Sequence, residues 1–213
     1  MASLRYASPI VVPATSRHTA TVIILHGLGD SGHGWRSAVD HFLRKQRLNE
    51  VKFILPHAPS LPITLNGGMA MPGWFDIKTL GGTMEQLKAG LIEEDAPGIL
   101  RSQSYINSLV QAEISNGIPS ERIVLGGFSQ GGAMSLFSGL TSAVKLAGII
   151  GMSAWLPLSG SFKSHLPADN LNKATPVLMA HGDMDPVVRF EWANESQKLL
   201  SSEGYDVTLK VYR

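Results

Sequence analysis

The chain contains no cysteine among its 213 residues. This absence excludes disulfide bonds, thiolate metal sites, a cysteine nucleophile and S-acylation of the chain itself. The sequence also lacks an excess of charge of one sign, because the formal net charge is +1 and only 16% of the residues are charged. Proteins that bind nucleic acids usually carry a basic excess, so we expect no nucleic-acid partner.

Long hydrophobic runs are lacking as well. The longest apolar run lies around residues 22–25, which is far shorter than a signal-peptide core or a membrane span. The segment before Asp30 contains no acidic residue and in this respect resembles a transit peptide. Pro9 and Pro13, however, interrupt any amphipathic helix there. Residues 8–13 are better interpreted as an edge strand. We expect a cytoplasmic location and consider a nuclear pool in addition.

Segments typical of strands and helices alternate along the chain. Apolar, β-branched runs predict buried strands, and the longer segments between them predict helices. The expected strands are residues 20–25, 51–55, 123–125, 145–153, 176–180 and 207–212, and the expected helices are residues 35–47, 97–116, 130–140 and 191–202. This alternation is typical of a mostly parallel sheet covered by helices on both faces. We predict a single α/β domain over residues 1–213, because this length suits one such domain.

The clearest chemical signal is a serine between a strand and a helix. Gly127-Phe128-Ser129-Gln130-Gly131 matches G-x-S-x-G, the nucleophile elbow, in which the serine sits on a strained turn above the sheet edge. Glycines on either side have no Cβ, so the strand and the helix can approach closely. The bare pattern is weak in a chain with 22 glycines, and the flanking strand and helix give it weight. The alternative is a glycine-rich turn with a capping serine.

A serine hydroxyl is nearly inert at neutral pH. It needs a base, a group that orients the base, and donors for the oxyanion that develops during acyl transfer. In hydrolases that carry such an elbow, the acid follows the nucleophile in the chain and lies after a later strand. Asp183 and Asp185 both meet this condition. The alternative is that the two aspartates only cap a helix that starts near Val188.

The oxyanion donors would be two backbone N–H groups. One belongs to Gln130, at the start of the helix after the serine, and the other to Leu28, in the glycine-rich loop of residues 26–34. The competing interpretation of this loop is a phosphate-binding loop. Its residues match neither the P-loop nor the G-x-G-x-x-G pattern in register, so we prefer the oxyanion role.

Seven blocks of sequence, in chain order, resemble the acyl-protein thioesterases. They are Leu25-His-Gly-Leu-Gly-Asp30, Pro56-His-Ala-Pro59, Ala70-Met-Pro-Gly-Trp-Phe-Asp76, Asn116-Gly-Ile-Pro-Ser120, Gly126-Gly-Phe-Ser-Gln-Gly-Gly132, Ser153-Ala-Trp-Leu-Pro157 and His181-Gly-Asp-Met-Asp185. Members of this family are α/β-hydrolases that also act as lysophospholipases or small carboxylesterases. The matches run from about residue 20 to the end of the chain.

The resemblance implies a set of roles. Ser129 would be the nucleophile and Asp185 the acid, with the N–H groups of Leu28 and Gln130 as the oxyanion hole. The substrates would be S-palmitoylated proteins and lipid-like esters, hydrolysed through an acyl-enzyme without cofactor or metal. Contact with a membrane surface would be transient and would occur only through the substrate.

An unusually apolar segment, residues 61–74, suggests where an acyl chain would bind. Together with Trp155 it could line a groove for a long alkyl chain, and the candidate acyl-binding residues are Leu65, Met71, Trp74 and Trp155. The alternative is that these side chains only cover the edge of the sheet.

The sequence departs from the family pattern at the catalytic histidine. In the family this residue follows the last strand in a G-M-x-H-S block, and the present sequence ends at Arg213, where that block would begin. None of the seven histidines fits the role, so we expect the 213-residue chain, without this histidine and the final helix, to be inactive. Two alternatives to a thioesterase stay open: a non-catalytic binder of apolar ligands on a hydrolase scaffold, and a carboxylesterase for short esters.

Overall fold

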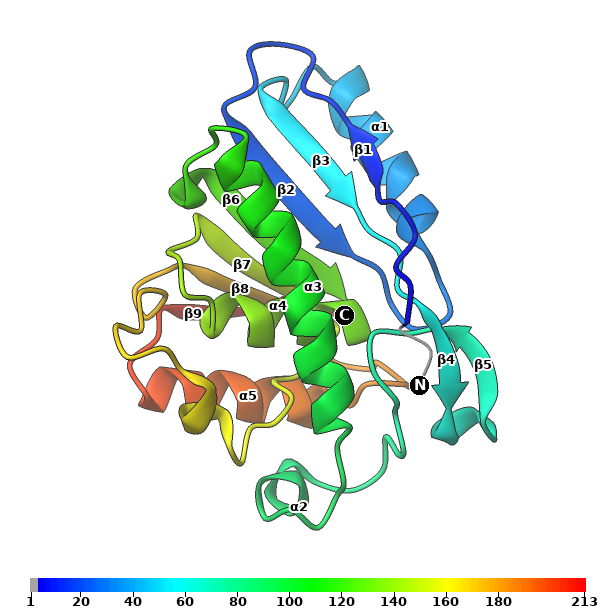
Figure 1. Cartoon of the computed structure of the whole chain (residues 1–213). Coiled ribbons are helices and arrows are strands. Elements are labelled where there is room, and N and C mark those ends of the chain that lie inside the picture. Colours follow the sequence, from blue (N-terminus) through cyan, green and yellow to red (C-terminus); the bar gives the residue numbers. More distant parts are fainter. Residues whose placement is uncertain (1–3) are drawn as a thin grey trace.

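A seven-stranded sheet forms the centre of the computed structural model, which describes residues 4–213 (Figure 1). In spatial order the strands are β1 (Ile10–Val12), β3 (Val51–Leu55), β2 (Ala20–Leu25), β6 (Ile123–Phe128), β7 (Gly148–Met152), β8 (Val177–Gly182) and β9 (Val207–Tyr212). All neighbours are parallel except β1, which pairs antiparallel with β3 at the edge. The predictions of a mostly parallel sheet and of an edge strand within residues 8–13 are confirmed.

Helices cover one face of this sheet along most of its width. They are α3 (Ala96–Ser115), α4 (Gln130–Leu140) and α5 (Phe190–Ser202), while α1 (Arg36–Arg44) lies on the opposite face (Figure 1). Every residue of α4 is buried, because small residues such as Gly132 and Gly139 let the helix lie directly on β6 and β7. The predicted positions of these four helices agree with the structure to within a few residues.

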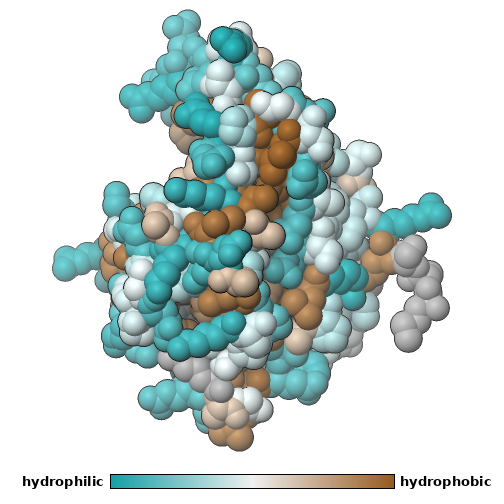
Figure 2. All heavy atoms as spheres, turned by 60° about the vertical axis from the view of Figure 1, so that its left-hand side comes forward, coloured by the Kyte–Doolittle hydropathy of each residue, from teal (hydrophilic) through white to brown (hydrophobic). Residues whose placement is uncertain are grey.

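The opposite face is covered only in part. There, Val39 of α1 packs with Phe53 and Leu55 over β3. Farther along, the face of β6 to β9 is half-exposed and forms a shallow hollow of about 390 Å³, whose lining includes Val124, Ile150, Leu178, Thr208 and Lys210. Figure 2 turns the side that carries β7 to β9 forward and shows hydrophobic side chains gathered in a hollowed band between hydrophilic ones. Among the described residues, double coverage of the sheet is therefore complete only near β2 and β3.

The apolar segment after β3 forms an element that the sequence did not predict. Strands β4 (Ser60–Ile63) and β5 (Met69–Pro72) pair antiparallel as a hairpin outside the main sheet (Figure 1). A short helix, α2 (Met84–Lys88), was also not predicted, although Thr83 and Gln86 form its capping box. None of the helices in the described part of the chain has the length and apolarity that a membrane span requires.

Candidate active site

Ser129 occupies a sharp turn between β6 and α4. Its backbone has φ 53° and ψ −122°, a strained conformation for a residue with a side chain. A Cβ atom at Gly127 would overlap the carbonyl of Gly131, and a Cβ atom at Gly131 would overlap the carbonyl of His26. The elbow geometry that the glycines predicted is therefore present, with the strand and the helix in close contact around the serine.

Three neighbouring strands bring the expected residues to one edge of the sheet. The N–H of Ser129, directly after β6, donates to the carbonyl of Met152 at the end of β7 (2.8 Å). The N–H of Ser153, directly after β7, donates in turn to the carbonyl of Ala180 in β8 (2.8 Å). Asp185 follows β8, so the loops that carry Ser129, Ser153 and Asp185 lie side by side at the carboxyl ends of the strands.

The two candidate acids differ in their surroundings. Asp183 is exposed, whereas Asp185 is half-buried and its Oδ1 accepts hydrogen bonds from the N–H groups of Val187 (2.9 Å) and Val188 (3.0 Å). Partial burial by itself would raise the pKa of Asp185. These two bonds, a hydrogen bond from the Ser153 side chain and the nearby His181 outweigh burial and lower that pKa below its ordinary value.

Neither aspartate caps a helix. Helix α5 begins at Phe190, and its N-cap residue Arg189 makes no capping hydrogen bond through its side chain. The N–H groups that Asp185 accepts lie before the helix, in the loop itself. The alternative in which both aspartates only cap this helix is therefore wrong.

The histidines do not complete the constellation. His181 is the nearest to Asp185, with 3.7 Å between Nε2 and Oδ2, but its ring is buried and Nε2 donates to the carbonyl of Val188 (2.7 Å). Within residues 4–213, no histidine is hydrogen-bonded to the hydroxyl of Ser129. The described residues also contain no group of three or more histidine, aspartate and glutamate side chains that could hold a metal ion.

The two expected oxyanion donors belong to segments that meet at Ser129. A Cβ atom at Gly27 would lie 3.4 Å from the Cβ of Ser129, so the loop that carries Leu28 lies against the elbow. Gln130 is the first residue of α4, where the N–H groups of a helix have no internal acceptor. In the part of the chain that the structure describes, neither the N–H of Leu28 nor that of Gln130 donates to a protein acceptor. Both are free to serve an oxyanion.

Gln130 also joins this region to the hairpin through its side chain. The fully buried amide accepts a hydrogen bond from the N–H of Trp74 (2.8 Å) and donates one to the carbonyl of Phe75 (2.6 Å). Just before them, the carbonyl of Pro72 in β5 accepts a bond from the N–H of Gly29 (2.8 Å). The hairpin is thus fixed to both segments that carry the expected oxyanion donors.

The four candidate acyl-binding residues do not share one surface. Leu65 is 41% exposed at the hairpin and Met71 is half-buried, with its sulfur near Gly29. Trp74 is 0% exposed and its indole N–H donates to the carbonyl of His26 (2.8 Å), so the prediction that it lines an open groove has to be corrected. A large ring with a buried polar partner is a core residue here.

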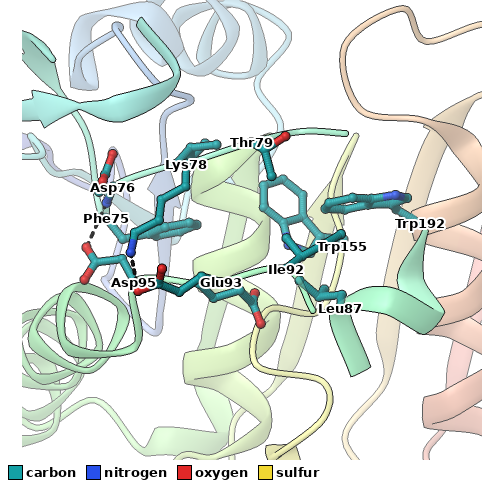
Figure 3. A pocket seen from close by; sticks show the side chains of 12 residues that line it. Phe75, Asp76, Lys78, Thr79, Leu87, Ile92, Glu93, Asp95, Trp155 and Trp192 are labelled. Carbon is teal, nitrogen blue, oxygen red and sulfur yellow. Dashed lines mark hydrogen bonds and ion pairs between the residues drawn. The ribbon is translucent and has the colours of Figure 1, made fainter. Parts of the chain in front are cut away.

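Trp155 lines a cavity that is separate from the hairpin and nearly filled by side chains. Its ring and that of Trp192 lie at one side, and Lys78, Glu93 and Asp95 lie at the other (Figure 3). The free space is only about 20 Å³, close to the volume that one water molecule needs. In this structure Trp155 therefore does not form an open groove with Leu65 and Met71, which is a second correction to the expected acyl site.

A half-buried carboxylate in the wall of this cavity, that of Glu94, escaped the sequence analysis. Both oxygens of Glu94 accept from the N–H of Leu158 (3.0 and 2.9 Å), a residue in a left-handed conformation with φ 52°. Burial outweighs this hydrogen bonding and raises the pKa of Glu94 to about 7. In the sequence, Glu94 precedes a helix start and has no pattern that distinguishes it from a solvated acidic residue.

Comparisons with known proteins agree with this arrangement. Residues 6–213 match the model of the phospholipase/carboxylesterase family. The chain is 57% identical over 212 residues to acyl-protein thioesterase 1 of Neurospora crassa, covering 100% of this chain and 85% of that protein. It is 56% identical to acyl-protein thioesterase 1 of Gibberella zeae, covering 100% of this chain and 88% of that protein.

Solved structures give the same result. Maize acyl-protein thioesterase 2 superimposes with a TM-score of 0.81 at 29% identity, covering 98% of this chain and 90% of that one. Arabidopsis thaliana SOBER1 has a TM-score of 0.81 at 30% identity, covering 91% of this chain and 88% of that one. With the strained elbow and the parallel sheet, these matches show that the chain belongs to the phospholipase/carboxylesterase family of α/β-hydrolases.

Proposed function

We propose that the protein is a serine hydrolase that cleaves thioester-linked fatty acyl groups, such as palmitoyl, from S-acylated proteins. The observation that carries this proposal is Ser129 on its strained turn, beside two N–H groups that donate to no acceptor within residues 4–213. The names of the fungal relatives support thioesters as the substrate class. Lysophospholipase and carboxylesterase activity toward lipid-like esters is part of the same proposal.

The reaction follows from the geometry of the sheet edge. The hydroxyl of Ser129 attacks the thioester carbonyl while a base takes its proton, and the N–H groups of Leu28 and Gln130 stabilise the resulting oxyanion. The tetrahedral intermediate then expels the substrate's cysteine thiolate, which receives the proton from the base. Water hydrolyses the acyl-enzyme in the same way and regenerates Ser129. Asp185 is ionised at neutral pH and orients the base.

The base itself is assigned by resemblance. We propose a histidine in a Gly-Met-x-His-Ser block after β9, because no histidine within residues 4–213 is hydrogen-bonded to Ser129. The carboxyl end of β9 pairs with β8 at Gly182, close in sequence to Asp185. A segment that follows β9 therefore starts beside the loop of the proposed acid.

The acyl chain is proposed to lie along the hairpin. Leu65 and Met71 present apolar surface there, and the β5 end of the hairpin is bonded to the loop that carries Leu28. A carboxylesterase for short esters would use the same serine without this surface, so the dependence of rate on chain length separates the two activities. Protein substrates and transient contact with their membranes are part of this proposal.

The decisive experiment is active-site labelling of the protein encoded by the complete reading frame. A fluorophosphonate should modify Ser129, and Ser129→Ala should abolish both labelling and palmitoyl-thioester hydrolysis. Ser37→Ala, an exposed serine on α1, serves as the control and should behave like the unaltered protein. Retained turnover in Ser129→Ala would exclude this nucleophile. Binding of palmitate without labelling or turnover would instead support the alternative, a non-catalytic apolar-ligand binder.

A further inference from the structure

His26 is a fully buried histidine that the proposed chemistry does not use directly. It directly follows β2, is 1% exposed, and both of its ring nitrogens are hydrogen-bonded to the backbone. Nδ1 lies 2.7 Å from the carbonyl oxygen of Gly27, and Nε2 lies 3.0 Å from the backbone nitrogen of Ala58. Because a carbonyl can only accept and an N–H can only donate, the ring must carry its proton on Nδ1.

The backbone of His26 is also fixed by contacts with other segments. Its carbonyl accepts the indole N–H of Trp74 (2.8 Å), and Gly131 of α4 packs directly against that carbonyl. The charged and titratable groups that act on the ring are Asp30 and His57. Burial is the largest influence and lowers the pKa of His26, so the ring is neutral at neutral pH.

The bond to Gly27 has a consequence for the next residue. The carbonyl of Gly27 and the N–H of Leu28 belong to one planar trans peptide group, so they point in opposite directions. The same carbonyl also accepts the N–H of Asp30 (3.3 Å), which closes a tight turn over Gly27 to Asp30. Fixing this oxygen from two sides therefore fixes the direction of the Leu28 N–H, which donates to no protein acceptor among the described residues.

We propose that His26 is a positioning residue whose Nδ1–H tautomer holds the Gly27–Leu28 peptide so that the Leu28 N–H points into the oxyanion hole. Gly27 lies against Ser129, so the fixed peptide is next to the reacting atoms. This inference rests on the proposed hydrolase function, because only acyl transfer needs that N–H. Rotation of the peptide would remove one of the two oxyanion donors without changing any group that binds the acyl chain.

Two substitutions of His26 test its two hydrogen bonds one at a time, because each keeps one bond and removes the other. In His26→Asn the amide nitrogen lies about where Nδ1 lies, so donation to Gly27 is kept and the bond from Ala58 is lost. In His26→Gln the amide oxygen can accept from Ala58, but the donor to Gly27 is lost. Loss of one oxyanion donor costs about 10²–10³-fold in kcat. We therefore expect a fall of about 100-fold in kcat for His26→Gln and of less than about 10-fold for His26→Asn, with KM nearly unchanged in both.

The test uses the protein from the complete reading frame, p-nitrophenyl butyrate as the substrate, and His33→Gln as the control, since His33 is exposed. Urea unfolding checks that each variant folds, and ¹⁵N NMR of the unaltered protein reads the tautomer of His26 without any reaction. The positioning role would be overturned if kcat fell equally in both variants, in parallel with their loss of stability. It would also be overturned if both variants kept the kcat of the unaltered protein, or if NMR showed the proton of His26 on Nε2. Absence of serine-dependent turnover in the unaltered protein would overturn the proposed function, and the positioning role with it.

Discussion

The side-chain amide of Gln130 holds the backbone of Trp74 and Phe75, while the N–H of the same residue is free for the oxyanion. Gln130 thus belongs to the elbow, and its side chain also holds the segment that directly follows the hairpin. The amide is fully buried, so each of its two bonds satisfies a backbone group that water cannot reach. The position of the hairpin and that of the oxyanion donors are therefore linked through Gln130.

Replacing Gln130 by leucine should destabilise the protein. The N–H of Trp74 and the carbonyl of Phe75 would stay buried without partners, and each unpaired group costs about 1–3 kcal/mol. We expect the free energy of unfolding to fall by at least about 2 kcal/mol in urea titrations. Gln103→Leu is the control, because Gln103 is half-buried and its amide donates to a hydroxyl, that of Thr141, and not to the backbone of another segment within residues 4–213. If the free energy of unfolding fell equally in the two variants, the two buried hydrogen bonds of Gln130 would not have the importance that we assign to them.

The two aspartates should differ strongly in their effect on rate. Asp185→Asn should lower kcat by about 10³–10⁴-fold, because an amide cannot hold the base histidine in the required tautomer. Asp183→Asn should change kcat by less than about 3-fold, since its side chain is exposed. Steady-state kinetics with a palmitoyl thioester measure both values. The opposite ranking would transfer the role of the acid to Asp183.

Substitutions on the hairpin should affect long acyl chains selectively. Each methylene that leaves water contributes about 0.8 kcal/mol, so replacing Leu65 and Met71 by serine should lower kcat/KM for a palmitoyl thioester at least about 10-fold. The value for an acetyl thioester should change by less than about 2-fold. Leu100→Ser, a partly exposed position on α3, is the control and should affect neither substrate. Equal losses on both substrates would mean that the hairpin has only a structural role.

Glu94 should make stability depend on pH. Its folded pKa of about 7 lies above the ordinary value of 4.5, so the folded state binds more protons than the unfolded state between these values. The contribution of Glu94 to the free energy of unfolding is fully present below about pH 4.5. It is lost as the pH rises to about 7, and the total loss is about 3 kcal/mol.

Glu94→Gln keeps an acceptor for the N–H of Leu158 but cannot ionise. We expect the variant to lose the decline between pH 4.5 and 7 and to be more stable than the unaltered protein at pH 8. Urea unfolding at several pH values measures this difference. The neighbouring Glu93→Gln is the control, because Glu93 is exposed and its ion pair with Lys78 lies at the surface. Parallel stability curves for the Glu94 variant and the unaltered protein would contradict the raised pKa.

The sequence determined the features that depend on short stretches of chain. The alternation of strands and helices and the turn at Ser129 could be predicted, because hydrophobic periodicity and glycine next to serine act within a few residues. The edge strand within residues 8–13 was also predicted from a short stretch, because two prolines there interrupt a helix and suit an edge strand. The hairpin was missed, because residues 60–72 contain both proline and glycine and lack the alternation of a long strand.

Only the tertiary structure decided what happens to residues that meet across the chain. Trp74 is buried because its backbone meets Gln130, 56 positions away, and its indole meets His26, 48 positions away. Asp185 is distinguished from Asp183 by hydrogen bonds that depend on how the loop after β8 folds beside Ser153. Burial and hydrogen bonding of this kind arise from contacts between distant segments, so no local pattern in the sequence records them.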